Sequence, residues 1–345
     1  IVDDSAVYRQ AIREALSEVP TVEVIGIARD GLEAIRKIAE QDPDAITLEF
    51  ALPGLDGFGV LEQMRHQGAR AKAIMVSSRT EQNVKLTTDA LMKGAFDFVL
   101  KPTGGTPEQN HRQLRQSLAD RMKALAEAMV PSSSSSLPGI SERADATRTT
   151  GLIEAVVIGS STGGPIALRQ VIPALRSNLR VPVIIVQHMP GRFTGQLAEQ
   201  LDELSEVPVR EIVETTPIEG GTVYLATGGK HTELYRQGED VYARLTLDPP
   251  EHHCRPAVDF TLRSAIGVFG GRLLSVILTG MGKDGQEGCR AVSEAGGRVF
   301  AQHPEDCGVY GMPKAVIESG LAHAILHTDQ IAVEIHRMIG DDPSS

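Results

Sequence analysis

The sequence is poor in aromatic residues: it contains no tryptophan, and phenylalanine, tyrosine and tryptophan together make up 4% of its 345 residues. Its cores must therefore be packed from aliphatic side chains, for which a hydrophobic fraction of 41% is ample. The chain also lacks any apolar run approaching the ~18 residues that are needed to cross a bilayer. These features argue against membrane insertion, and the length suffices for two domains of ordinary size.

Cysteine and net positive charge are also scarce. Cys254, Cys289 and Cys307 are odd in number and widely spaced, which argues against a disulfide framework and predicts a reducing, cytoplasmic location. His252, His253 and Cys254 are consecutive, but adjacent side chains rarely converge on one ion, so a plain loop or core position is favoured there over a metal site. The net charge of -11 repels phosphate backbones and argues against nucleic acid as a partner.

In the first 104 residues, short apolar runs alternate with amphipathic stretches. The runs that predict strands are residues 1–2, 22–27, 45–48, 73–76 and 98–100. Helical patterns between them include residues 7–16 and 31–38, and a last amphipathic helix is expected over 108–129. This alternation predicts an α/β fold with a parallel sheet covered on both faces. Because the chain opens inside the first of these strands, we expect this domain to be truncated at its N-terminus.

Residues 131–150 differ from the rest of the chain, because five serines follow Pro131 and the remainder is charged and poor in apolar residues. Such a composition predicts a flexible linker. Strand patterns resume at residues 155–158, 181–186, 222–226, 273–278 and 299–301. Helices are expected after Gly164, Phe193, Arg255 and Gly285. We therefore expect a first domain over 1–104, a helix and serine-rich linker over 105–150, and a second α/β domain over 151–340.

A glycine-rich turn follows the first strand of the second half, with the sequence Gly159-Ser160-Ser161-Thr162-Gly163-Gly164-Pro165. A strand, such a turn and a helix are typical of dinucleotide binding, of a phosphate cradle or of a serine nucleophile. Dinucleotide binding needs an acid after the next strand, where Gln187-His188 stand, and a phosphate cradle needs a lysine where Pro165 stands. The nucleophile is therefore the favoured interpretation.

Three polar residues, Ser161, His188 and Asp284, follow three strands of this predicted sheet. Because the carboxyl ends of parallel strands share one edge, we expect these side chains to converge. A histidine can take the proton of a serine hydroxyl, and an aspartate can orient that histidine. Backbone N–H donors for the resulting oxyanion are expected at Thr162, in the helix N-terminus, and at Met281, in a glycine-flanked loop.

Each of these residues also has an ordinary structural interpretation. Alone, Ser161 would more often cap a helix, His188 would more often be a core histidine, and Asp284 would more often belong to a turn; Ser160 is an equally valid hydroxyl by composition. Their joint position at strand ends favours catalysis. The chain order serine, histidine, aspartate differs from the order nucleophile, acid, histidine of the α/β-hydrolases. His303 could supply a histidine in that order, but it lies in a turn-like segment.

Polar residues also stand at strand carboxyl ends in the first half: Asp3, Asp4, Glu49, Ser77 and Lys101. Acids, a hydroxyl and a lysine at one edge are typical of a pocket for a divalent cation and a phosphoryl group. By spacing alone, solvated loop acids and a surface lysine are an equally good interpretation.

Both halves resemble one family, the CheB-type chemotaxis methylesterases, in which a receiver domain precedes a protein-glutamate methylesterase domain. The first-half motifs are Val2-Asp3-Asp4-Ser5, Leu52-Pro53-x-x-Asp56-Gly57, Val76-Ser77-Ser78 and Phe98-x-x-Lys101-Pro102. The second-half motifs are the Gly159–Gly164 turn, Gln187-His188-Met189-Pro190, Arg255-Pro256-x-Val258-Asp259, Leu278-Thr279-Gly280-Met281-Gly282-x-Asp284-Gly285 and Tyr310-Gly311-Met312-Pro313. The resemblance implies a flavodoxin-like, doubly wound receiver and a catalytic α/β domain with a mainly parallel sheet.

The resemblance also implies an activity. The expected enzyme is a serine hydrolase that releases methanol from glutamate methyl esters on the cytoplasmic helices of chemoreceptors, and that deamidates receptor glutamines. The family's nucleophile falls on Ser161, its base on His188, its acid on Asp284 and its oxyanion donor on the Met281 N–H. No cofactor is implied for catalysis, and a chemotaxis-type histidine kinase is an expected partner. The alternative is a non-catalytic signalling adaptor of a chemosensory pathway.

One position departs from the receiver pattern. The phosphorylated aspartate of receivers stands four residues before the loop proline, and Glu49 occupies that position here. By resemblance, Asp4 and Glu49 would hold Mg²⁺, Ser77 would contact the phosphoryl group and Lys101 would pair with it. Because glutamate is one methylene longer than aspartate, we predict that ordinary aspartyl phosphorylation does not switch this protein. The longer carboxylate is expected to reach toward Lys101 and Ser77 and partly imitate the phosphorylated state; a receiver kept only for docking or inhibition is the alternative.

Overall fold

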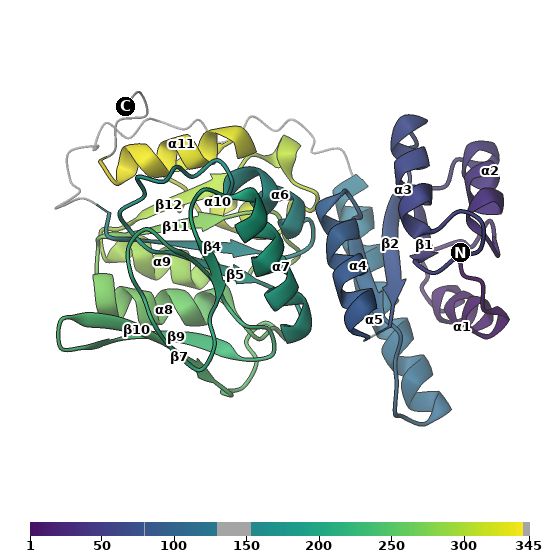
Figure 1. Ribbon diagram of the computed structural model, residues 1–345, viewed down its shortest axis with the longest axis horizontal. Coiled ribbons are helices and arrows are strands. Elements are labelled where there is room, and N and C mark those ends of the chain that lie inside the picture. Colours follow the sequence, from purple (N-terminus) through teal and green to yellow (C-terminus); the bar gives the residue numbers. More distant parts are fainter. Residues whose placement is uncertain (79, 130–152, 341–345) are drawn as a thin grey trace. The chain divides into compact units, whose positions relative to one another are not determined.

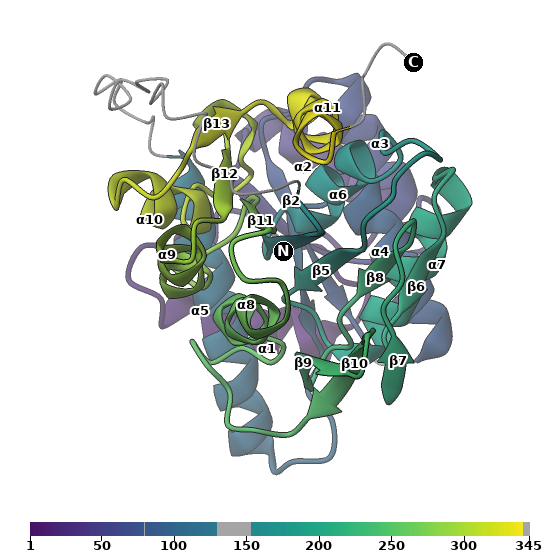
Figure 2. The same cartoon turned by 90° about the vertical axis from the view of Figure 1, so that its left-hand side faces the viewer.

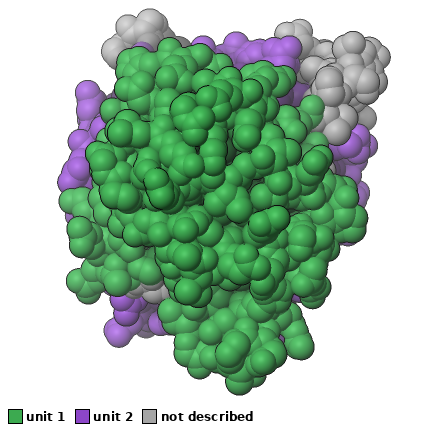
Figure 3. All heavy atoms as spheres, turned by 90° about the vertical axis from the view of Figure 1, so that its right-hand side faces the viewer, with its two compact units in different colours: residues 1–129 green, residues 130–345 purple. Residues whose placement is uncertain are grey.

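The computed structural model describes residues 1–78, 80–129 and 153–340 of the chain. The chain divides into two compact units, residues 1–129 and 130–345, which Figure 3 shows in separate colours. The serine-rich linker predicted over 131–150 lies outside the described residues. Among the helices of the described residues, none is long and apolar enough to span a membrane.

The first unit is built on a parallel three-stranded sheet in the order β1-β2-β3 (Figure 1). Its strands are β1 (Ala45–Glu49), β2 (Lys72–Ser77) and β3 (Asp97–Leu100). Its helices are α1 (Ala6–Ser17), α2 (Gly31–Gln41), α3 (Gly57–His66), α4 (Glu81–Met92) and α5 (Pro107–Met129). Short side chains cap the helices: the Asp30 carboxylate, for example, accepts a hydrogen bond from the Glu33 N–H at the start of α2 (2.7 Å).

Two predicted strands of the first unit are not regular strands, so these predictions were wrong. Val2 forms only single parallel bridges, to Ala28 and Leu48. Residues 22–27 meet Ile1 only near their end, where the Gly26 carbonyl oxygen accepts a hydrogen bond from the Ile1 amino group (2.9 Å). A strand needs a partner along its length, and the apolar run at 22–27 finds a partner only where residues 1–3 pass beside it.

Helix α5 belongs to the first unit, which therefore extends beyond the expected boundary at residue 104. It packs against α1 and β3. Its large buried side chains recur at intervals of three and four residues, as one face of a helix requires, and are Leu114, Leu118, Met122 and Leu125. The apolar periodicity that predicted this helix is thus the pattern that attaches it to the sheet.

The second unit contains a seven-stranded sheet in the order β13-β12-β11-β4-β5-β8-β6, with all neighbouring pairs parallel. Its strands are β4 (Ala155–Ser160), β5 (Val183–Gln187), β6 (Val209–Glu211), β8 (Val223–Leu225), β11 (Leu273–Ile277), β12 (Arg298–Gln302) and β13 (Ala324–Leu326). Every residue of β4, β5 and β11 is buried. Continuous apolar runs of this kind suit central strands that are covered on both faces.

Helices cover both faces of this sheet, as Figure 2 shows. One face carries α8 (Val258–Phe269), α9 (Gln286–Glu294) and α10 (Met312–Glu318), and the other carries α6 (Gly164–Val171), α7 (Gly191–Leu204) and α11 (Thr328–Met338). A short 3₁₀ helix, η1 (Pro304–Asp306), follows β12. The α/β domain with a mainly parallel sheet that was expected for this half is thus confirmed.

The second unit also contains an antiparallel sheet in the order β7-β10-β9, which was not predicted from the sequence. It consists of β7 (Thr215–Pro217), β9 (His231–Gln237) and β10 (Asp240–Thr246). Only Gly238 and Glu239 separate β9 from β10, and Gly238 has a φ of 65°, which favours glycine. A two-residue loop with glycine between alternating segments is a hairpin signal that the sequence offered.

Candidate active site

Ser161 lies in the turn that connects β4 to α6. Its N–H donates a hydrogen bond to the Thr279 carbonyl oxygen (3.0 Å), which ties the turn to the segment after β11. Gly163 has a φ of 80°, and a Cβ there would lie 3.0 Å from Thr279 Oγ1. The turn can therefore approach the neighbouring segment this closely only with glycine at position 163.

Ser160, the alternative hydroxyl, has a different environment. It is fully buried, and its hydroxyl donates a hydrogen bond to Gln187 Oε1 (2.6 Å). The Gln187 amide in turn donates to the Ser161 carbonyl oxygen (2.9 Å). Ser160 thus holds the turn together, whereas the side chain of Ser161 is partly exposed at the sheet edge.

His188 and Asp284 lie beside this turn, at the ends of the segments that follow β5 and β11. The His188 N–H donates to the Ser160 carbonyl oxygen (3.0 Å), and its ring Nε2 lies 2.8 Å from Asp284 Oδ2. With the Nε2 proton donated to the carboxylate, the lone pair lies on Nδ1. Among the described residues no hydrogen bond joins the Ser161 hydroxyl to His188. Catalytic hydrogen bonds of this kind commonly tighten only when substrate is bound.

Asp284 is held rigidly at the start of α8. Its carboxylate accepts hydrogen bonds from the backbone N–H groups of Val258 (2.7 Å) and Asp259 (3.0 Å). Burial raises the pKa of Asp284, but the hydrogen bond and charge of His188 and these two backbone donors outweigh burial and lower that pKa. The carboxylate is therefore charged at neutral pH, as the orientation of an imidazole requires.

The protonation of His188 depends on two neighbours. Burial lowers the pKa of His188, but its contacts with Asp284 and with the Cys254 thiol outweigh burial and raise it to about 10. Cys254 was not predicted from the sequence to be part of the site. Its position in the loop before α8, far from His188 in the chain, gave no signal of this contact.

His252 and Asp259 form a second pair behind the first one. His252 Nε2 lies 2.8 Å from Asp259 Oδ2 and 3.9 Å from Asp284 Oδ1. Asp259 also accepts a hydrogen bond from the Gly288 N–H (2.7 Å) at the start of α9. Position 252 lies in a loop, as expected, but its side chain belongs to the surroundings of the site, which the sequence did not indicate. Asp259 stands in one of the motifs that carried the family resemblance.

The loop after β11 offers a backbone donor beside Ser161. A Cβ on Gly280 would lie 2.8 Å from the Cβ of Ser161, so the two backbones are in close contact. The Met281 N–H makes no hydrogen bond within the described residues and is available for an oxyanion. The other predicted donor, Thr162, lies in the same turn as Ser161, and its carbonyl oxygen accepts from Thr279 Oγ1 (2.9 Å). His303 lies after β12 and hydrogen bonds to Glu305, so the structure does not join it to Ser161 or Asp284.

The polar residues of the first unit converge on Lys101. Its ammonium group lies 2.9 Å from Asp3 Oδ2, contacts Glu49 Oε2 and lies 4.0 Å from the centre of the Tyr8 ring. Burial lowers the pKa of Lys101, but hydrogen bonds to Glu49 and Asp3 outweigh burial and raise it. Asp3, Glu49 and Lys101 are all buried, so the interpretation as solvated loop residues was wrong for these three.

Glu49 reaches Lys101 as expected, but the expected contact with Ser77 is absent from the described hydrogen bonds. Glu49 Oε1 accepts from the N–H groups of Phe50 (2.6 Å) and Ala51 (3.3 Å), which leaves Oε2 for Lys101. The Ser77 hydroxyl instead accepts a hydrogen bond from Thr87 Oγ1 (2.8 Å). Backbone donors and the ammonium charge thus direct the glutamate away from Ser77.

This pocket does not suit Mg²⁺. A divalent cation requires several oxygen ligands directed at one point. Here the Lys101 ammonium lies between the carboxylates of Asp3 and Glu49 and balances their charge. Asp4, the other expected ligand, is exposed. Among the described residues, these acids do not form a cluster whose ligand atoms could close around one ion.

Comparison with known proteins places the chain in a family. The family model "CheB methylesterase" matches residues 156–335, and the model "Response regulator receiver domain" matches residues 1–111. A curated relative from Symbiobacterium thermophilum, named protein-glutamate methylesterase/protein-glutamine glutaminase, is 40% identical over 99% of this chain and 96% of its own length. A relative of the same name from Thermotoga maritima is 39% identical over 98% of this chain and 97% of its own length.

A solved structure agrees with the assignment. The crystal structure of the Thermotoga maritima CheB methylesterase catalytic domain is 43% identical, with a TM-score of 0.53, and the match covers 54% of this chain and 98% of that chain. The chain therefore belongs to the CheB methylesterase family and carries a response regulator receiver domain in its first half.

Proposed function

We propose that this protein is a serine hydrolase that cleaves glutamate methyl esters on chemoreceptors and deamidates receptor glutamines in chemotaxis-type adaptation. The observation that carries the proposal is the hydrogen bond between His188 Nε2 and Asp284 Oδ2, directly beside the Ser161 turn, in a chain of the CheB methylesterase family. The relatives' names contain both activities, esterase and glutaminase.

The geometry supports a two-step acyl transfer. The Ser161 hydroxyl attacks the ester carbonyl while His188 Nδ1 accepts its proton, and the Met281 N–H donates to the oxyanion that forms. The tetrahedral intermediate then expels methoxide, which takes the proton from His188 and leaves as methanol. Water, deprotonated by the same imidazole, hydrolyses the acyl-enzyme and restores Ser161 and the glutamate. With a glutamine side chain, ammonia takes the place of methanol as the leaving group.

A methanol-release assay on methylated receptor tests this proposal. The whole chain should release methanol, and Ser161→Ala should reduce turnover by roughly 10⁴-fold or more, because the members of a triad act as a unit. Ser177→Ala, which removes an exposed serine hydroxyl outside the site, is the matched control and should keep full turnover. Receptor binding without methanol release would instead support a non-catalytic adaptor, which no feature of the described site favours.

We also propose that the receiver is not switched by ordinary phosphorylation. Glu49 stands at the acceptor position and is already paired with Lys101, the partner that the family resemblance assigns to the phosphoryl group. This pairing supports a state that partly imitates phosphorylation, without bound Mg²⁺. Comparison of the whole chain with residues 151–345 tests the alternative: a faster fragment would show that the first unit inhibits.

The proposed function also implies a substrate, a cellular compartment and a partner. Methylated helices of chemoreceptors are the substrates, and the reaction takes place in the cytoplasm. A chemotaxis-type histidine kinase is a binding partner of the receiver rather than its effective phosphodonor.

A further inference from the structure

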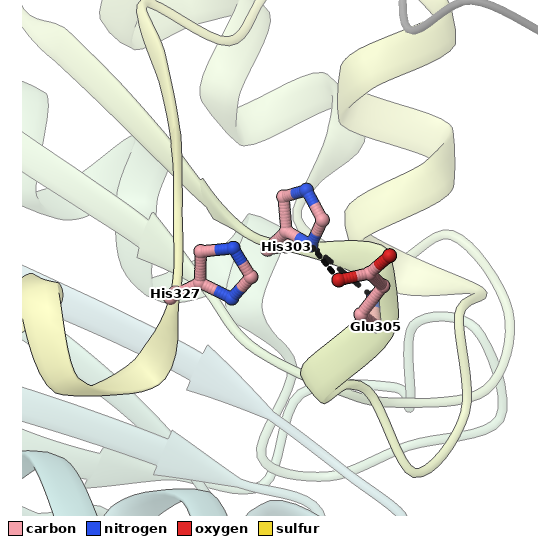
Figure 4. Close-up of side chains that lie close together, drawn as sticks. All are labelled: His303, Glu305 and His327. Atoms are coloured by element: carbon pink, nitrogen blue, oxygen red, sulfur yellow. Dashed lines mark hydrogen bonds and ion pairs between the residues drawn. The ribbon is translucent and has the colours of Figure 1, made fainter.

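A second cluster of ionisable side chains lies at the same edge of the sheet but outside the proposed active site. His303 directly follows β12, His327 directly follows β13, and Glu305 lies in η1 between them (Figure 4). Each of the three offers one ligand atom, and these atoms all lie within 4.8 Å of one another. The two imidazole rings are stacked, with their centres 4.0 Å apart.

The ring of His327 is oriented by a carboxylate. Its Nδ1 lies 3.2 and 3.3 Å from the two oxygens of Asp306, which also accepts a hydrogen bond from the Thr328 N–H (2.7 Å). A proton held between Nδ1 and a carboxylate leaves the lone pair on Nε2. This arrangement of carboxylate and histidine is the one that orients metal-binding histidines and increases their basicity.

The ring of His303 presents a lone pair toward Glu305. Its Nδ1 accepts a long hydrogen bond from the Glu305 N–H (3.3 Å) and lies 3.9 Å from Glu305 Oε2. Figure 4 shows the carboxylate facing this nitrogen. A cation bound between this lone pair and the Glu305 carboxylate would be attracted to both, and it would replace only that one long hydrogen bond.

We propose that His303, Glu305 and His327 form a Zn²⁺ site, with Asp306 orienting His327. Two imidazole nitrogens and a carboxylate oxygen are a ligand set that zinc accepts, whereas Mg²⁺ and Ca²⁺ require mainly oxygen. Zinc–ligand distances of about 2.0–2.2 Å place ligand atoms roughly 3.3 Å apart in a tetrahedral site. The ligand atoms lie within 4.8 Å of one another and the two rings are stacked, so zinc binding requires the 80% exposed Glu305 side chain to approach and one ring to turn out of the stack.

Cys307 is not part of the ligand set, although it is the next residue after Asp306. Its thiol donates to the His303 carbonyl oxygen (3.4 Å), and Cys307 is not among the residues whose ligand atoms cluster here. Water would complete the coordination.

The site would stabilise the segment that supports the catalytic edge. The segment starts at His303 and ends at α10, and near its end the Val309 carbonyl oxygen accepts from the Gly280 N–H (3.1 Å), while the Met312 N–H donates to the Gly280 carbonyl oxygen (2.8 Å). Gly280 is the residue whose backbone contacts Ser161. Zinc at the start of the segment would therefore fix the loop on which Met281 is carried, without taking part in the chemistry.

The test is a zinc titration of the whole chain, purified without a histidine tag and freed of metal by a chelator. Competition with a chromophoric chelator should show one bound Zn²⁺ per chain, and zinc should raise the midpoint of thermal unfolding. His303→Ala and His327→Ala should each weaken binding at least tenfold, and Asp306→Asn, which can still accept from Thr328, should weaken it by about 10–100-fold.

His252→Ala is the matched control, because His252, Asp259 and Asp284 form the other cluster of possible ligands in the described residues. This variant should keep the zinc. Far-UV circular dichroism of each metal-free variant shows that its fold is intact. Zinc binding that survives His303→Ala and His327→Ala, or that disappears in His252→Ala alone, would overturn the proposal. So would the absence of any binding by the unmodified chain.

Discussion

His188 Nε2 lies 2.8 Å from Asp284 Oδ2, and the same carboxylate oxygen accepts the Val258 N–H at 2.7 Å. The acid of the proposed triad is thus positioned by the N-terminus of α8 as well as by its contact with the histidine. Because Nε2 faces the acid, Nδ1 is the nitrogen available to accept the proton of Ser161. The helix dipole at α8 adds to the stabilisation of the charged carboxylate.

Asp284→Asn should abolish most of the activity while leaving the fold intact. An uncharged amide at this position accepts hydrogen bonds more weakly than the carboxylate does and can itself donate to the ring nitrogen. The imidazole of His188 therefore loses its fixed tautomer. We expect the kcat for methanol release to fall roughly 10⁴-fold, as when the acid of such a triad becomes an amide. Asp259→Asn, which changes a neighbouring buried carboxylate without a contact to His188, should have an effect at least tenfold smaller. Equal losses in the two variants would contradict the assignment.

The rate of methanol release should rise with pH into the alkaline range. Burial lowers the pKa of His188, but Asp284 and Cys254 raise it to about 10, and only the deprotonated imidazole can act as a base. The folded pKa exceeds the ordinary value of 6.5, so the stability contributed by His188 is complete below that value and is lost as pH rises through about 10. The measurement is kcat/KM against pH, with Ser161→Ala subtracted as the background of alkaline ester hydrolysis. A profile that levels off near neutral pH would show that His188 titrates near its ordinary value.

A Cys254 variant distinguishes the effect of Cys254 on the pKa of His188 from the effect of Asp284. Cys254→Ala removes one of the two contacts that raise the pKa of His188, so the rising limb should move to lower pH. Cys307→Ala, which removes a thiol after β12 with no contact to His188 among the described hydrogen bonds, should leave the limb in place.

The residues at the carboxyl ends of the strands could be predicted from the sequence better than the loop residues that contact them. The runs at β4, β5 and β11 are apolar throughout because both of their faces are covered, and this pattern is local to each strand. The polar residues that follow such strands lie at one edge of the sheet. The neighbourhood of Ser161, His188 and Asp284 could therefore be predicted from their positions after predicted strands.

Contacts between loops carry no such local signal. His252 and Cys254 lie in a loop whose path depends on how α8 packs, so neither the pair His252–Asp259 nor the contact of Cys254 with His188 could be predicted. The same limit applies to Glu49: its length predicted the contact with Lys101, but the two backbone N–H groups that hold its other oxygen were not foreseeable from the sequence.

Glu49 should resist phosphorylation and stabilise the receiver. Incubation with a small-molecule phosphodonor should leave the unmodified chain unlabelled, whereas Glu49→Asp should gain label. Among the described residues, Glu49→Gln leaves the buried Lys101 ammonium with Asp3 as its one remaining acidic partner, and we expect a loss of about 1–3 kcal/mol of unfolding free energy. Glu40→Gln, which breaks the exposed pair with Arg36 on α2, is the control and should change stability little. Stable label on the unmodified protein would refute the expectation.

Gly280→Ala should impair catalysis more than it impairs stability. A Cβ at this position would lie 2.8 Å from the Cβ of Ser161 and 2.4 Å from Met312 Sδ, so the Gly280–Met281 loop must move away from the nucleophile. The Met281 N–H then no longer lies where the oxyanion forms, and loss of one such donor typically costs about 10²–10³ in kcat. Gly267→Ala is the matched control: it lies inside α8 with open space where the Cβ would be, and it should preserve activity and stabilise the helix by up to about 1 kcal/mol. Methanol release and thermal unfolding, measured on both variants, separate the two effects, and an active Gly280→Ala protein would show that Met281 is not the donor.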